Sequence, residues 1–238
     1  MAADPHRERS PGRRVWDLPV RLTHWLLLAA VSGSWISAEL AGDAFRWHEY
    51  CGYTVLVLVT FRLLWGLVGT RYARFASFLR GPRAVLEYLR RLRSPAAYRP
   101  SIGHNPLGGW VVLVMLSLLL CQALCGLFAN DQVINTGPLY GWVSGAASDA
   151  LTRLHHRFFH ILQGIVGLHI TAVTLYFIVR RDNLVWPMLS GRKPASEVPA
   201  GEEIQGSRLW LALLLVVLLG AALALTIRLA PQASLSMF

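Results

Sequence analysis

Residues 209–230 read LWLALLLVVLLGAALALTIRLA, a run in which Arg228 is the one charged side chain. An α-helix needs about 20 such residues to cross the hydrocarbon core of a bilayer, which is about 30 Å thick. Four more apolar stretches of similar length precede it, at residues 20–40, 48–69, 107–128 and 155–179. The sequence therefore predicts an all-α integral membrane bundle with four core helices and a fifth, C-terminal transmembrane helix.

The overall composition agrees with a membrane protein. Apolar residues make up 54% of the 238 residues and charged residues only 15%, whereas a soluble domain carries about a quarter charged residues. We expect an N-terminal tail at 1–19, a membrane domain at 20–193, and a linker with the fifth helix at 194–238. The first span follows a long arginine-rich segment, which argues against a cleaved signal peptide.

The net charge of +10 is distributed in alternation along the chain. Arginines crowd the N-terminal tail and the segments 70–106 and 180–208, whereas the connections at 41–47 and 129–154 contain few. By the positive-inside rule, the arginine-rich segments face the cytoplasm and the other connections and the C-terminus face outward. We therefore expect a multi-pass membrane protein with a cytoplasmic N-terminus that contacts lipid, and we do not expect a nucleic-acid partner.

Within the inward segment, the run GPRAVLEYLRRLRSP predicts a short helix between Pro82 and Pro95. Its apolar side chains share one face and its arginines the other, which is typical of a helix lying on the membrane surface. Two interpretations stay open, a connector that follows the membrane and a specific docking site. The outward segment 129–154 is expected to fold over the outer mouth of the bundle.

Cysteine chemistry contributes little to the function. Cys51, Cys121 and Cys125 lie in or beside the spans, and no loop pair suggests a disulfide framework. The motif C-x-x-C-H is absent from the sequence, which excludes covalent attachment of a c-type haem.

Histidines at membrane depth are candidate functional residues because ionisable groups are costly there. In the stretch LTRLHHRFFHILQGIVGLHI (151–170), His155 and His169 are 14 residues apart. At 100° and 1.5 Å per residue, they lie within about 40° of one face and about 21 Å apart along the axis. His156 and His160 point away from that face.

Depth then pairs these histidines with two others. His24 lies in the inner half of the first span and His48 at the outer start of the second, so the predicted pairs are His24 with His169 and His48 with His155. Two imidazoles at matching depth on different helices suit the iron of a porphyrin. The sequence thus predicts two non-covalent haems b, an inner and an outer one, with bis-histidine iron.

Arg62 is 14 residues after His48, on the same face and at the depth of the inner pair. A buried arginine needs an anion, and a propionate of the inner haem would serve. The alternative is that its side chain extends to the cytoplasmic surface.

These residues lie in runs that resemble a known family. The runs are VWDLPVRLTHW, WHEYCGYTVLVLVTFRLLWGLVGTRYARF, GHNPLGGW and LTRLHH…GLHI. Over residues 14–193 they resemble the bacterial cytochrome b561 and nickel-hydrogenase b-type cytochrome superfamily, whose four-helix core holds two haems b. The resemblance implies the same ligands, His24, His48, His155 and His169. His104 lies in a family motif before the third span, where contact with a propionate or a quinone is expected rather than axial ligation.

The resemblance also implies location in the bacterial inner (cytoplasmic) membrane and the function, which is electron transfer across that membrane in a respiratory chain. We expect exchange with membrane quinone on one side and, on the other, with a redox protein such as a c-type cytochrome or a hydrogenase-like enzyme. The chain would act as a homodimer or as a subunit of a larger complex. A self-contained superoxide:quinone oxidoreductase is the alternative, and a non-redox haem or metal transporter a third.

Overall fold

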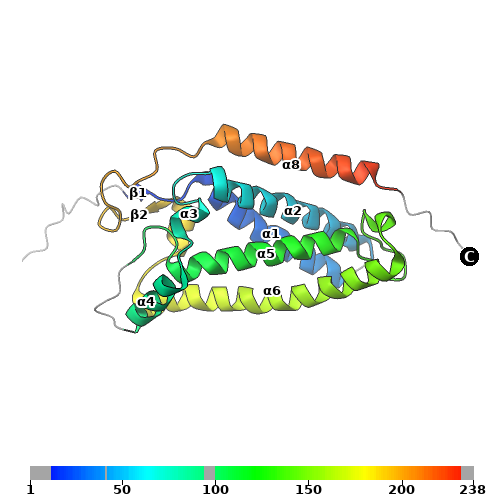
Figure 1. The fold of residues 1–238 in the computed structure, drawn as a ribbon, viewed down its shortest axis with the longest axis horizontal. Coiled ribbons are helices and arrows are strands. Elements are labelled where there is room, and N and C mark those ends of the chain that lie inside the picture. The colour runs from blue at the N-terminus through cyan, green and yellow to red at the C-terminus, as the bar shows by residue number, and fades with distance from the viewer. Residues whose placement is uncertain (1–11, 41, 94–99, 232–238) are drawn as a thin grey trace, which may run out of the picture.

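The computed structural model describes residues 12–40, 42–93 and 100–231. Five long helices lie side by side, with short elements gathered at the two ends (Figure 1). The long helices are α1 (Leu18–Leu40), α2 (Phe45–Val68), α5 (Pro106–Leu127), α6 (Gly145–Arg180) and α8 (Leu209–Leu229). The short elements are β1 (Arg13–Arg14), η1 (Gly42–Ala44), α3 (Phe75–Phe78), α4 (Pro82–Leu92), η3 (Tyr140–Trp142), α7 (Val185–Ser190) and β2 (Arg192–Lys193).

The architecture confirms the predicted all-α membrane bundle. Within the described residues, four helical segments are long and apolar enough to span a membrane, namely Gly42–Val68, Pro106–Leu127, Gly145–Arg180 and Leu209–Leu229. The first predicted span forms α1, which has the length to cross but is less apolar than these four. Arg21, His24 and Glu39 interrupt its apolar character.

Helix α6 is longer than the apolar stretch at 155–179 predicted. It has 36 residues and is therefore about 54 Å long, well beyond the hydrocarbon thickness. Its additional turns begin after Ser144, whose side chain accepts a hydrogen bond from the amide of Ala147 as a helix N-cap. Hydropathy detects only the apolar part of a helix. The helical residues 145–154 of the outward segment 129–154 were therefore not predicted.

The backbone of α6 lies close to that of α5 but farther from those of α1 and α2. Helix α1 packs along α2, α2 also contacts α5 and α8, and α6 packs against α5. The fifth long helix, α8, lies along α2 at one edge of the bundle, whereas α6 lies with α5 at the opposite edge (Figure 1). Among the described residues, α6 does not pack closely against α1 or α2. Side chains nevertheless meet between these helices, as Trp35 of α1 and Phe159 of α6 do, and Leu162 of α6 is buried with Ala30 of α1.

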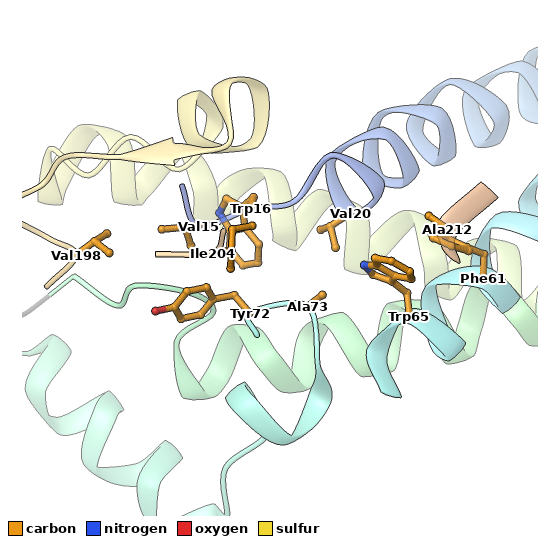
Figure 2. Close-up of a cluster of buried hydrophobic side chains, with 10 residues drawn as sticks. All are labelled: Val15, Trp16, Val20, Phe61, Trp65, Tyr72, Ala73, Val198, Ile204 and Ala212. Carbon is orange, nitrogen blue, oxygen red and sulfur yellow. The ribbon is translucent and has the colours of Figure 1, made fainter. Parts of the chain in front are cut away.

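One end of the bundle is closed by a buried cluster that joins four parts of the chain (Figure 2). The cluster consists of Val15, Trp16, Val20, Phe61, Trp65, Tyr72, Ala73, Val198, Ile204 and Ala212. Strand β1 pairs with β2 in antiparallel orientation, with Arg13 opposite Lys193. Val15 and Trp16, in the expected N-terminal tail, and Val198 and Ile204, in the expected linker, are thus buried in this cluster.

Asp17 organises this end of the bundle, and its side chain is 1% exposed. One carboxylate oxygen accepts from the amide of Val20 at 2.8 Å, which caps the N-terminus of α1. The other accepts from Nε1 of Trp65 at 3.0 Å and from the hydroxyl of Thr70. A single buried carboxylate thus connects the start of α1 to the end of α2.

Replacing Asp17 by alanine is expected to lower the free energy of unfolding by about 2–4 kcal/mol, because three buried donors lose a charged acceptor. Asp17→Asn, which keeps one acceptor oxygen, should lose less. Thermal unfolding of the detergent-purified protein measures the effect, with Asp43→Ala as control because Asp43 is exposed. Equal thermal unfolding midpoints for Asp17→Ala and the wild-type protein would contradict a stabilising role of Asp17.

Candidate haem centres

The structure brings the four predicted histidines together as two pairs. The ring centroids of His24 on α1 and His169 on α6 are 6.5 Å apart. Those of His48 on α2 and His155 on α6 are 6.0 Å apart. Because both pairs share the continuous helix α6, they are separated along its axis by about 21 Å.

The outer pair, His48 and His155, is oriented by backbone carbonyls. Nδ1 of His48 lies 2.9 Å from the carbonyl oxygen of Ser34, and Nδ1 of His155 lies 2.9 Å from that of Gln122. A ring that donates its Nδ1–H in this way has its lone pair on Nε2. Such hydrogen bonds are the usual support of metal-ligating histidines, because they set the tautomer and the ring orientation.

The Gln122 side chain was not anticipated from the sequence. Its amide nitrogen lies 3.1 Å from Nε2 of His155, while its Oε1 atom is buried with no hydrogen-bond partner among the described residues. A polar amide within an apolar span was the signal that could have identified it. Gly126, one turn further along α5, gives the imidazole room, since a Cβ atom there would lie 3.0 Å from Cε1 of His155.

The inner pair, His24 and His169, has a different environment. Nδ1 of His24 is buried and has no hydrogen-bond partner in the described part of the chain, and the His24 ring contacts Trp25 edge-on. His104 lies nearby, packed between Trp16 and Phe78 with ring centroids at 4.7 and 4.6 Å. Burial, followed by the nearby positive charge of Arg62, lowers the pKa of His104 to about 3, so this imidazole is neutral.

Arg62 is buried, with 5% of its side chain exposed, so its side chain does not extend to the surface. Its Nη1 donates to the carbonyl oxygen of Ala73 at 3.1 Å, and its guanidinium lies 5.6 Å from the centre of the Phe75 ring. It makes no ion pair with any described carboxylate. The buried carboxylate of Asp17 lies beyond ion-pair distance but close enough to interact electrostatically with this guanidinium.

His156 and His160 are exposed on α6, and the ring of His156 lies beside that of His155, with centroids 6.2 Å apart. Nδ1 of His160 lies 3.2 Å from Oε1 of Gln163 on the same helix. Their exposure agrees with the helix-face argument, and the exclusion of both as haem ligands stays a prediction.

The donor set fits a porphyrin better than a bare metal ion. No group of three or more His, Cys, Asp or Glu side chains gathers within the described ranges, whereas a protein metal site without a macrocycle usually takes three or four such ligands. Two imidazoles that bind one metal ion from opposite sides, at about 2 Å each, have ring centres about 6 Å apart. Both pairs have about that spacing. In the outer pair, the amide nitrogen of Gln122 lies 3.1 Å from Nε2 of His155 and would have to turn away for that nitrogen to bind iron.

Space and charge around the pairs agree with the same group. Gly52, one turn from His48 on α2, has no atom within 4 Å of the position of an added Cβ. Between the two pairs, Leu162 of α6 is buried in an apolar cluster with Ala30 of α1 and Val59 of α2. Arg62 would match the negative charge of a propionate. The residues present therefore fit haem.

Comparison with known proteins agrees with this chemistry. The family model described as prokaryotic cytochrome b561 matches residues 15–191. A relative from Yersinia pestis, named "Probable superoxide oxidase CybB", is 25% identical over 185 residues, which cover 71% of this chain and 93% of the relative. No solved structure is significantly similar to the chain. The family match spans most of the chain, including all four paired histidines, and the chain therefore belongs to the prokaryotic cytochrome b561 family of b-type haem cytochromes that transfer electrons across membranes.

Proposed function

We propose that this protein holds two haems b and passes electrons through them across the bilayer. The observation that supports the proposal is the meeting of two imidazole pairs at two depths of one bundle, each with the spacing of bis-histidine ligation. His48 and His155 would hold the outer haem, and His24 and His169 the inner one.

Haem b supplies reversible one-electron oxidation and reduction at its iron. The chain supplies the position and the surroundings of that iron. The carbonyls of Ser34 and Gln122 orient the outer imidazoles and increase their basicity as ligands. At the inner end, buried Arg62 contributes positive charge, which stabilises the reduced state of a nearby redox centre.

The charge pattern supports an orientation with the N-terminus, α4 and the segment around β2 in the cytoplasm, and with the connection before α6 and the C-terminus outside. The membrane would be the bacterial inner membrane. The protein would exchange electrons with quinone on one side and with a redox protein, such as a c-type cytochrome, on the other.

A second candidate function is the oxidation of superoxide at the outer side, favoured by the name of the relative. Two superoxide anions would each lose one electron to give two molecules of oxygen, and the two electrons with two protons would reduce one quinone to quinol. Exposed Arg153 and Arg157 on α6 lie next to His156 and beside the outer pair. Their positive charge would attract an anionic substrate.

The haem content of histidine variants tests the pairing. Alanine at His24 or His169 should remove one haem, and alanine at His48 or His155 the other, because one imidazole cannot replace the pair. A double variant within one pair should retain one haem, whereas a double variant that takes one histidine from each pair should retain none. Haem per chain, measured as the pyridine haemochrome, is the readout.

His156→Ala and His160→Ala are the matched controls, because both residues are exposed on the same helix. Each control should keep two haems. A wild-type protein with one haem per chain, or a double variant within one pair that loses both haems from a folded protein, would refute the assignment.

The midpoint potential of the inner haem tests Arg62. Arg62→Gln should make this haem harder to reduce by roughly 60 mV, which for one electron corresponds to a tenfold change in the equilibrium constant. Arg62→Lys, which keeps the charge, should restore most of the potential. Redox titration of the α-band resolves the two centres, and an unchanged inner potential would remove Arg62 from the haem site.

Superoxide and quinone turnover separates the two functions. With a steady enzymatic source of superoxide, the second function predicts one quinol per two superoxide consumed, without a protein partner and abolished by superoxide dismutase. Arg153→Gln/Arg157→Gln should slow this reaction several-fold at low ionic strength and less at high ionic strength. If superoxide leaves the haems oxidised while quinol reduces them, the second function is rejected and relay to a protein partner is supported.

A further inference from the structure

An apolar groove lies between the surface helix α4 and the first turns of α5. It has a volume of about 320 Å³, and its walls are Pro82, Val85, Leu86, Leu89 and Trp110. Three of these side chains are well exposed, with Leu86 at 50%, Leu89 at 40% and Trp110 at 43%. The groove therefore presents apolar surface that no other described residue covers.

The groove is held in place on two sides. The hydroxyl of Tyr88 contacts that of Tyr176 on α6, and the guanidinium of Arg180 donates to the carbonyl of Leu92. On the other side, Nε1 of Trp110 donates to the carbonyl of Arg80 at 2.9 Å. Helix α4 is thus fixed to α5 and α6, so the groove is a preformed part of the fold.

Positive charge flanks the groove along α4. Arg83 and Arg90 are seven residues apart, hence on one side of the helix, about 10 Å from each other and next to Leu86. Both are exposed, and neither forms an ion pair in the described part of the chain, where Glu87 pairs with Arg91. An apolar groove bordered by two unpaired cations is complementary to a molecule with a hydrocarbon chain and an anionic head.

We propose that this groove binds one anionic phospholipid, with an acyl chain against Leu86, Leu89 and Trp110 and its phosphate at Arg83 and Arg90. The position in the fold supports a lipid, because Trp110 lies in the second turn of α5, at the level of the membrane interface. Anionic lipids and clustered basic residues meet at the cytoplasmic leaflet. The proposal rests on the inward orientation proposed above and is independent of electron transfer.

Native mass spectrometry of the haem-loaded protein tests the charge requirement. The probes are phosphatidylglycerol and phosphatidylcholine with identical dioleoyl chains, titrated into the same detergent. The wild-type protein should retain one phosphatidylglycerol in preference to phosphatidylcholine, and Arg83→Gln/Arg90→Gln should weaken this retention roughly tenfold or more. Arg153→Gln/Arg228→Gln, which removes two exposed arginines from the opposite end, is the matched control and should leave it unchanged.

A second variant pair tests the acyl-chain requirement. Leu86→Ala/Leu89→Ala keeps both arginines and should also weaken retention of dioleoyl phosphatidylglycerol several-fold, while haem content shows that the protein is folded. Equal loss in the Arg153/Arg228 control would identify a general charge effect and overturn the proposal. Equal retention of both lipids, preferential retention of quinone over phosphatidylglycerol, or undiminished retention in either groove variant would also overturn it.

Discussion

Four imidazoles lie in the long helices of the bundle, where an ionisable ring is costly, and each lies against a second imidazole on another helix. The position of α6 relative to α1 and α2 decides whether these rings meet. Helix α6 contacts α5, and it meets α1 and α2 through the paired rings, through Trp35 and Phe159, and through an apolar cluster that includes Leu162. Closer packing of α6 would shorten the distance between the paired rings, so their spacing of 6.0 and 6.5 Å depends on how far α6 lies from α1 and α2.

Helix α5 and the end of the bundle near α4 help to position the paired rings. Gln122 and Gly126 on α5 orient His155 and give it room. At the other end, Asp17 connects the start of α1 to the end of α2, and the cluster around Trp65 joins the N-terminal segment, the linker and α8. The relative depth of His24 and His48 depends on these contacts, because they fix the position of α1 along the axis of α2.

Much of the fold was predictable from local pattern. Hydropathy located the long helices, and proline with amphipathic spacing located α4 from Pro82 onward. The early start of α6 was missed because its first turns are not apolar. The β1–β2 pairing was missed as well, since two-residue strands carry no periodic signal. The role of Gln122 depends on the approach of His155 from another helix, which no spacing along α5 reveals.

The sequence by itself determined which histidines share a face and a depth, because helix geometry and the charge pattern are local properties of the chain. It placed His155 and His169 on one face of α6 and left His156 and His160 outside. Only the tertiary structure decided that the rings of each pair meet at about 6 Å, that Arg62 is buried instead of reaching the surface, and that α8 packs on α2. These features depend on how helices distant in the sequence are spaced and rotated, and packing between them sets that arrangement.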